Sequence, residues 1–215
     1  MMNFKKILPR IGMCLVWFAL ITQFILMLLN REVSVFELII RFFSYFTITT
    51  NLLVALYFTN LVWPENGFWR DRLRSGSAAT AITTCILIVG IVYQTLLKDL
   101  WRPTGLQRVA DQLLHGIIPL FMLGYWLVIV KSQNIGLKSV YSWLLYPIGY
   151  LAFALGRGYL SGFYPYPFLE IKKIGFTQTA INIGLIALGT IMMLTLLTAI
   201  GRGIQKLKGP ATRHQ

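Results

Sequence analysis

The residues of this chain with the clearest potential for chemistry lie in a hydrophobic segment that also carries polar side chains. Ser44, Thr47 and Asn51 are spaced so that on a helix they share one face. These polar side chains would have no hydrogen-bond partners in lipid, so we expect this helix face to lie against other helices or a cavity. A threonine hydroxyl becomes an effective nucleophile when an adjacent base removes its proton. The alternative is that these side chains only join helices by hydrogen bonds.

A base for such a threonine is predicted in the segment VADQLLHGIIPLFMLGYW, which contains His115. On a helix, Asp111 lies one turn before the histidine, and its carboxylate can accept the proton of one imidazole nitrogen and leave the other nitrogen as a base. Pro119 cannot donate to the carbonyl of residue 115, which predicts a bend beside the histidine. Trp126 continues this face and is expected to line a cavity. The alternative is an Asp–His pair that only packs helices.

A third polar face is predicted further along the chain. Tyr146, Tyr150 and Arg157 fall at helical spacing, and the two tyrosines are expected to line the same cavity. An arginine inside a membrane is costly unless it is paired or solvated. We therefore expect Arg157 either to neutralise Asp111 or Glu170 or to hold a ligand carboxylate.

Two other groups are predicted at the membrane interface. Glu37 and Arg41 are one helical turn apart and are expected to form an ion pair there. The stretch FYPYPF, residues 163–168, is interpreted either as an interfacial aromatic belt or as a lid over the mouth of a cavity.

The composition indicates that membrane-spanning helices position these residues. The 215 residues are 56% hydrophobic and only 13% charged, whereas soluble domains carry about 25% charged residues. The net charge is +13, but the basic residues lie at the ends of hydrophobic segments, where they orient helices and meet anionic lipid. We therefore do not expect nucleic-acid binding. Cys14 and Cys85 lie in apolar runs, which makes a disulfide framework unlikely to be part of the fold.

No cofactor or metal is predicted from the sequence. It contains no cluster of residues with metal-ligand spacing and no glycine loop of the phosphate-binding type. The second histidine, His214, lies in the tail, so the sequence also excludes a haem held by two axial histidines from the spans.

The sequence predicts an all-α, polytopic integral membrane protein with a single six-helix transmembrane domain over residues 1–215. A span needs about 20 apolar residues. The expected spans cover residues 8–29, 35–62, 78–97, 109–130, 137–160 and 176–200. Lysine and arginine are most frequent in the terminal segments and in the stretches on the same side, which predicts that both termini are cytoplasmic. The basic start of the chain, followed by a long apolar run without a small-residue cleavage site, is expected to be an uncleaved signal anchor.

The predicted depths of the two reactive side chains agree. At 1.5 Å per residue, Thr47 lies ~10–18 Å and His115 ~9–10 Å from the outer face. Both therefore belong to the outer half of the membrane, where they can meet.

With these residues in hand, the chain resembles a known family. FTITTNLLVAL, LLHGIIPLF, YPIGY and GFYPYPFLE resemble the androgen-induced-gene and androgen-dependent TFPI-regulating membrane proteins, most closely their bacterial branch. The resemblance extends over most of the chain in order and spacing. It implies an intramembrane threonine hydrolase in the bacterial inner membrane, which cleaves fatty acid esters of hydroxy fatty acids. It assigns the nucleophile to Thr47 and the base to His115.

The chain departs from the family pattern at two places. The position one turn before the histidine is commonly a polar amide in the family, whereas Asp111 stands here and would make the imidazole more basic. The spacing in HGIIP is one residue shorter than in the animal members.

The expected mechanism begins when His115, oriented by Asp111, removes the proton of Thr47 as Thr47 attacks an ester carbonyl. Water then releases the fatty acid from the acyl-threonine. Asn51 or Ser44 is expected to donate to the oxyanion.

The expected partner is a lipid substrate that enters from the bilayer, with Arg157 or a nearby tyrosine holding its free carboxylate. Two other functions stay open at this point. One is a small lipid or carboxylate transporter or binding protein that uses the same polar cavity without catalysis. The other is an accessory membrane subunit whose polar residues only hold helices together.

Overall fold

The computed structural model describes residues 4–63, 68–130 and 134–207, and these residues form helices and connecting segments without any strand. Four stretches are long and apolar enough to cross a membrane: Lys6–Leu29, Gly76–Leu100, Gly105–Ile129 and Phe176–Lys206. A bent pair of helices over residues 35–62 makes a fifth if it is counted as one span. The predicted all-α class is therefore confirmed, together with helices suited to a membrane.

The core lies where four helices meet, and one of them, α5 (Gly76–Val92), is the most deeply buried of the long helices. α3 (Phe46–Val62) and α7 (Ile118–Ile129) pack against α5, and α1 (Phe4–Leu29) packs against α3 and α7. Fully buried side chains such as Val16, Val54, Ile86 and Met122 come from these four helices. The first turns of α5 are rich in alanine, serine and threonine, and such small residues let membrane helices approach closely.

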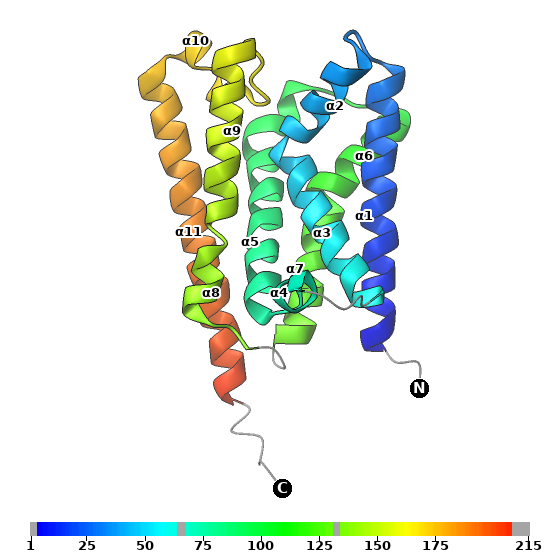
Figure 1. Ribbon diagram of the computed structural model, residues 1–215, viewed down its shortest axis with the longest axis vertical. Coiled ribbons are helices and arrows are strands. Elements are labelled where there is room, and N and C mark those ends of the chain that lie inside the picture. Colours follow the sequence, from blue (N-terminus) through cyan, green and yellow to red (C-terminus); the bar gives the residue numbers. More distant parts are fainter. Residues whose placement is uncertain (1–3, 64–67, 131–133, 208–215) are drawn as a thin grey trace, which may run out of the picture.

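On the other side of α5 stand α9 (Leu145–Ser161) and α11 (Phe176–Leu207). Figure 1 shows that α1 begins and α11 ends at the same end of the bundle. α2 (Val35–Ser44) and α10 (Ile171–Ile174) lie at the opposite end. The connection between α9 and α10 contains the short 3-10 helix η5 (Pro167–Leu169) and lies at that end too.

The prediction of a single continuous helix over residues 35–62 is wrong. The chain breaks at Tyr45, whose backbone is extended, and α2 and α3 meet at 77°. The break leaves backbone groups without helical partners, and two tyrosines distant in the sequence satisfy them. Tyr150 donates to the carbonyl of Ser44 over 2.8 Å, and the N–H of Thr47 donates to the hydroxyl of Tyr166 over 3.2 Å. The break therefore depends on contacts from the α9 side of the bundle.

The helix predicted over residues 109–130 is continuous but changes its winding at the histidine. α6 (Gly105–Gln112) leads into a single π-helical turn, η3 (Leu113–Ile117), and then into α7. Pro119 explains the turn, because it cannot donate to the carbonyl of His115. Opposite that carbonyl stands Gly90, where an added Cβ would lie 3.0 Å from the oxygen. A glycine at this position lets α5 approach the π-turn.

The other predicted helices differ from the structure mainly at their ends. In the helix expected over 78–97, regular α-helical winding ends with α5. The chain then forms a second π-turn, η1 (Tyr93–Leu97), and the 3-10 turn η2 (Lys98–Leu100). The helix expected over 137–160 is interrupted at residues 143–144, between α8 (Leu137–Ser142) and α9. α11 continues beyond the predicted end at residue 200. A short helix, α4 (Phe68–Leu73), precedes α5.

Candidate functional site

The structure brings Thr47 and His115 into contact, although they are far apart in the sequence. Thr47 Oγ1, on α3, lies 3.4 Å from His115 Nε2, on the π-turn η3. Thr47 is 8% exposed and the His115 side chain is 14% exposed. The distance is at the long end of hydrogen bonding. The two residues have the arrangement of a nucleophile and its base.

The surroundings of His115 determine which imidazole nitrogen carries the proton. Nδ1 lies 3.0 Å from the backbone oxygen of Asp111 and 3.2 Å from its carboxylate Oδ1. Oδ1 is close but not aligned for a hydrogen bond, so the backbone oxygen is the acceptor and the carboxylate acts through its charge. Both neighbours are acceptors, which places the proton on Nδ1. Nε2 therefore presents its lone pair to Thr47.

Tyr93 holds this pair from the side and was missed by the sequence analysis. Its hydroxyl donates to Asp111 Oδ2 over 2.5 Å, and its ring stacks on the imidazole of His115 with centroids 3.8 Å apart and planes at 9°. Tyr93 and His115 both stand on π-turns, which are frequent at functional sites. No spacing signal in the sequence distinguishes Tyr93 from the other tyrosines near helix ends.

The break at Tyr45 gives Thr47 an electrostatic environment that a straight helix would not. Thr47 is the second residue of α3, in the first turn. Backbone N–H groups of a first turn lack carbonyl partners within the helix, and the helix dipole is positive at this end. Negative charge that develops on the threonine oxygen, or on an atom bonded to it, is stabilised there.

A second tyrosine, Tyr166, touches Thr47 from the α9–α10 connection. Its hydroxyl lies 3.4 Å from Thr47 Oγ1 and accepts the backbone N–H of the same residue. Its ring stacks on Phe168 with centroids 5.0 Å apart and meets the Tyr45 ring edge-on at 5.9 Å. The stretch FYPYPF was predicted as an aromatic belt or a lid, and Tyr166 was not among the predicted site residues.

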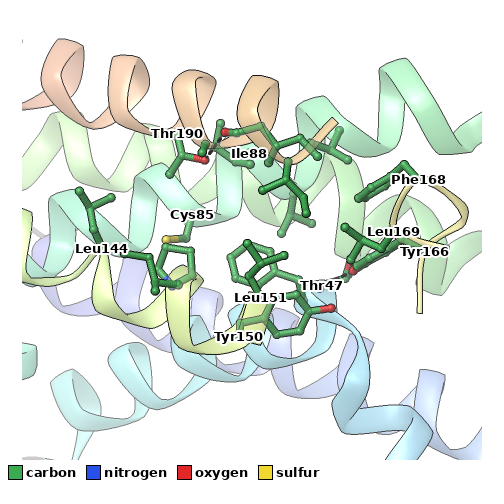
Figure 2. A pocket seen from close by; sticks show the side chains of 18 of the residues that line it. Thr47, Cys85, Ile88, Leu144, Tyr150, Leu151, Tyr166, Phe168, Leu169 and Thr190 are labelled. Carbon is green, nitrogen blue, oxygen red and sulfur yellow. Dashed lines mark hydrogen bonds between the residues drawn. The ribbon is translucent and has the colours of Figure 1, made fainter. Parts of the chain in front are cut away.

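Thr47 stands where two cavities meet. One, of about 230 Å³, lies between α3, α5, α9 and α11 and is lined mainly by aliphatic and aromatic side chains (Figure 2). The other, of about 410 Å³, contains the polar groups of Gln23, Tyr93, Asp111 and His115. Three residues belong to both linings: Thr47, Leu97 and Tyr166. Thr47 therefore borders an apolar cavity on one side and, on the other, a cavity that also contains these four polar side chains, which we call the polar cavity.

The two residues predicted to donate to an oxyanion are placed otherwise. The amide of Asn51 donates to the backbone oxygens of Thr47 and Leu114, at 2.8 and 3.4 Å. It therefore ties α3 to the π-turn. The hydroxyl of Ser44 donates to the carbonyl of Ile40 within α2. Neither side chain is directed at the hydroxyl of Thr47, because backbone carbonyls take up their donors.

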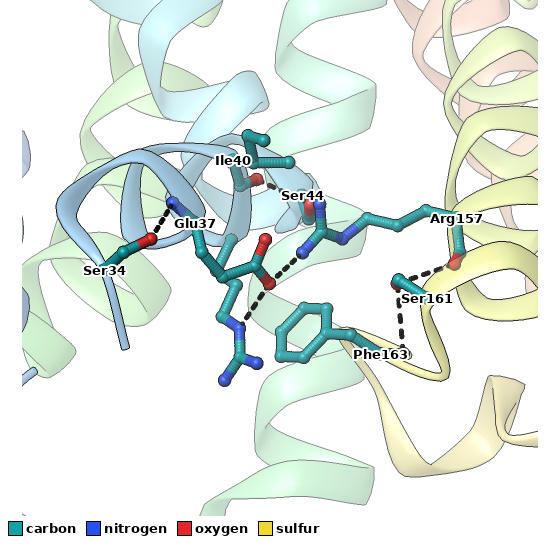
Figure 3. A network of polar contacts seen from close by, with 8 residues as sticks. Ser34, Glu37, Ile40, Ser44, Arg157, Ser161 and Phe163 are labelled. Carbon is teal, nitrogen blue, oxygen red and sulfur yellow. Dashed lines mark hydrogen bonds and ion pairs between the residues drawn. The ribbon is translucent and has the colours of Figure 1, made fainter. Parts of the chain in front are cut away.

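Arg157 pairs with Glu37, a partner that the sequence analysis did not name for it. The distance between Arg157 Nη2 and Glu37 Oε1 is 2.6 Å, and Arg41 Nε approaches the same oxygen to 2.7 Å (Figure 3). The predicted ion pair of Glu37 and Arg41 is confirmed. Both guanidinium groups also lie over the ring of Phe163, at 4.6 Å for Arg41 and 4.9 Å for Arg157. The expected pairing of Arg157 with Asp111 or Glu170 is not found.

Of the three aromatic residues predicted to line a cavity, the structure places one there. Tyr150 lines the apolar cavity. Trp126 is buried in the core, where its indole N–H donates to Thr80 over 2.9 Å. The hydroxyl of Tyr146 lies 2.9 Å from those of both Thr49 and Thr50. Trp126 and Tyr146 belong to neither of the two cavities described above, because they face the helix contacts around α5 and α3.

The described residues contain no group of three or more histidine, cysteine, aspartate or glutamate side chains that could hold a metal ion.

Comparison of the chain with protein-family models found no match. Comparisons with curated proteins and with solved structures found no match either.

Proposed function

We propose that the protein is an intramembrane lipid-ester hydrolase in which Thr47 is the nucleophile and His115 is the base. The observation that carries this proposal is the contact of 3.4 Å between Thr47 Oγ1 and His115 Nε2, with the proton of the imidazole held on the other nitrogen. A nucleophile, a base and a group that orients the base are the parts that covalent hydrolysis requires.

The two cavities favour an ester with one long apolar part and one part that carries polar groups. The apolar cavity runs along α11 from Ile183 to Ile191, which corresponds to ~12 Å at the rise of a helix. An acyl chain fits such a cavity, and its carboxyl carbon would then lie at Thr47. The alcohol half and the attacking water fit the polar cavity. Fatty acid esters of hydroxy fatty acids, which the family resemblance implies, have this form.

The reaction proceeds in two stages. In the first, the proton of Thr47 passes to His115 Nε2 while Oγ1 bonds to the ester carbonyl carbon. The tetrahedral intermediate collapses, the bond to the alcohol oxygen breaks, and His115 gives that oxygen its proton. In the second, His115 removes a proton from water as the water oxygen attacks the acyl-threonine. The bond between the acyl carbon and Thr47 Oγ1 then breaks, His115 returns the proton to Oγ1, and the fatty acid is released. Asp111 keeps the imidazole in place throughout.

We place this reaction in a protein that crosses the bacterial inner membrane six times and has both termini in the cytoplasm. The order α1, α2–α3, α5, α6–α7, α8–α9 and α11 supports six crossings, since α1 begins and α11 ends at the same end of the bundle. Thr47 and His115 lie toward the other end. The acyl chain enters between α5, α9 and α11 from the bilayer, and water enters the polar cavity.

The test is hydrolysis by the detergent-purified protein. The substrates are a fatty acid ester of a hydroxy fatty acid and a p-nitrophenyl ester. We expect Thr47→Ala and His115→Ala to abolish turnover, and Thr50→Ala to retain it, because the Thr50 hydroxyl bonds to Tyr146. A fluorophosphonate should label Thr47 in the wild type. Turnover that survives Thr47→Ala would refute the proposal.

One observation favours a second function. The apolar cavity can hold a lipid tail without any chemistry at Thr47, as in a lipid-binding or transport protein. That function predicts binding of a fatty acid by the wild type with no turnover of either ester, and no labelling by the fluorophosphonate.

A further inference from the structure

We propose that Tyr166 is a third catalytic residue, whose phenol O–H donates a hydrogen bond to the oxyanion that forms when Thr47 attacks the ester. This inference rests on the proposed hydrolase function and adds a residue to its machinery. The experiment below separates the failure of one from the failure of the other.

The hydrogen bonds around Thr47 allow the hydroxyl of Tyr166 to act as a donor toward the reacting oxygen. The phenol oxygen accepts the backbone N–H of Thr47 over 3.2 Å, so its own proton must go to another acceptor. Thr47 Oγ1, at 3.4 Å, is an acceptor in reach, and its own proton faces His115 Nε2. The hydroxyl of Tyr150 is also a neighbour of Tyr166 and donates its own proton to the carbonyl of Ser44. Tyr166 and His115 therefore contact the same reacting oxygen with opposite roles, one as donor and one as acceptor.

The donor moves only a short way to serve the intermediate. As Thr47 Oγ1 bonds to the carbonyl carbon, its proton passes to His115 and the π electrons of the carbonyl move to the carbonyl oxygen. That oxygen is bonded to the same carbon as Oγ1, so the phenol of Tyr166 reaches it when the ester carbonyl points toward Tyr166. The proton stays on Tyr166 throughout. When the carbonyl re-forms, the bond to the alcohol oxygen breaks and the hydrogen bond to Tyr166 weakens again.

The environment of the phenol strengthens such a hydrogen bond. Tyr166 is 8% exposed and borders both cavities at the point where the ester carbonyl must lie. Burial raises the pKa of Tyr166 above the ordinary value of a phenol, so the hydroxyl keeps its proton at neutral pH. Hydrogen bonds to a developing charge are worth more in a site of low dielectric than in water. The first turn of α3 adds positive potential at the same place.

The loop that carries Tyr166 is held in position before substrate binds. The ring is fixed by Phe168 and Tyr45. Phe163, in the same loop, is covered by the guanidinium groups of Arg41 and Arg157 (Figure 3). A donor that is already in place costs no reorganisation during the reaction, which is the property an oxyanion donor needs.

The experiment compares wild type, Tyr166→Phe, Thr47→Ala and Tyr57→Phe with the p-nitrophenyl ester. Tyr166→Phe keeps the ring and removes the hydroxyl. We expect kcat to fall by about 10²–10³-fold, as for the loss of one oxyanion donor, with KM unchanged. Tyr57→Phe is the matched control, because it removes a phenol that is 1% exposed from the core face of α3. It should retain wild-type kcat.

A second measurement distinguishes catalysis from a structural role. A trifluoromethyl ketone forms an oxyanion on Thr47, whereas the corresponding alcohol only fills the cavities. We expect Tyr166→Phe to weaken inhibition by the ketone by about the same factor as it lowers kcat, and not to change inhibition by the alcohol. The ratio of the two inhibition constants does not depend on the fraction of folded protein, so it holds even if the variant is less stable.

The outcomes separate the two proposals. If Thr47→Ala is inactive and Tyr166→Phe matches the wild type in kcat and in the inhibitor ratio, the role of Tyr166 is refuted and the hydrolase stands. A rise of KM alone, or equal weakening of both inhibitors, also refutes it. If Thr47→Ala is as active as the wild type, the hydrolase proposal fails first and the role of Tyr166 fails with it.

Discussion

The contact between Tyr93 and Asp111 gives a prediction whose size can be worked out from the structure. The hydroxyl of Tyr93 donates to Asp111 Oδ2 over 2.5 Å, and the two residues are 7% and 5% exposed. Tyr93→Phe removes the hydroxyl that donates to Asp111 but keeps the ring that stacks on His115. It therefore leaves a buried carboxylate oxygen without its donor, and a hydrogen bond to a charged group is worth about 1.5–3 kcal/mol.

That free energy can be lost in stability or in catalysis, and the two are measured separately. If the whole loss falls on the orientation of His115, kcat decreases by ~10–150-fold. If it falls on the folded state, the apparent melting temperature in detergent decreases by about 3–12 °C for a chain of this length. The assay is hydrolysis of the p-nitrophenyl ester together with thermal unfolding of the same preparation.

Tyr141→Phe is the control for this prediction. Its hydroxyl pairs with Thr195 over 3.0 Å in an exposed contact away from both cavities. The control should change neither kcat nor melting temperature by a measurable amount. If Tyr93→Phe behaves in both respects like Tyr141→Phe, then Tyr93 does not hold Asp111 and the reasoning is refuted.

Two further predictions concern the loop and the apolar cavity. A Cβ at Gly158 would overlap the ring of Tyr164, whereas a Cβ at Gly156 meets nothing; Gly158→Ala should therefore displace the loop that carries Tyr166 and lower both melting temperature and kcat. Gly156→Ala is its control, and equal behaviour of the two variants would contradict the prediction. Cys85 lines the apolar cavity at the end away from Thr47 (Figure 2), so Cys85→Leu should lower kcat/KM for long-chain p-nitrophenyl esters more than for short-chain ones. Cys14→Leu, on α1, should leave that ratio unchanged, and an unchanged ratio for Cys85→Leu would show that the acyl chain lies elsewhere.

Much of the fold follows from hydrophobic segment length and from helix periodicity. Each of the six hydrophobic segments is helical in the structure, and the end of the segment at Leu29 and the start of the last at Phe176 are where the sequence predicts them. The π-turn at His115 had a local signal, because Pro119 removes one backbone donor. The break at Tyr45 had none. No proline or glycine stands near it, and the groups that stabilise it, Tyr150 and Tyr166, come from other parts of the chain.

The site was predicted where its residues are one turn apart and missed where they come together only by folding. The Asp111–His115 pair is local to one helix, so its spacing alone brings the two side chains into contact. Tyr93 and Tyr166 lie on other elements. Nothing near Tyr93 distinguishes it from other tyrosines, and the stretch FYPYPF does not indicate which of its aromatic residues meets Thr47. Asn51 was placed on the correct helix face, but its amide is used by backbone oxygens that only the packed structure brings near it.

The sequence by itself determined that this chain forms apolar helices, that Thr47 shares a polar helix face with Asn51, and that Asp111 lies next to His115. These features depend on composition and on the geometry of a single helix. Only the tertiary structure decided that α2 and α3 break at Tyr45, which turns Thr47 from a mid-helix residue into one at a helix N-terminus. It also decided that the threonine lies between an apolar and a polar cavity. The physical reason is that a broken helix inside a bundle persists only if other elements satisfy its free backbone groups, and here two tyrosines from distant segments do so.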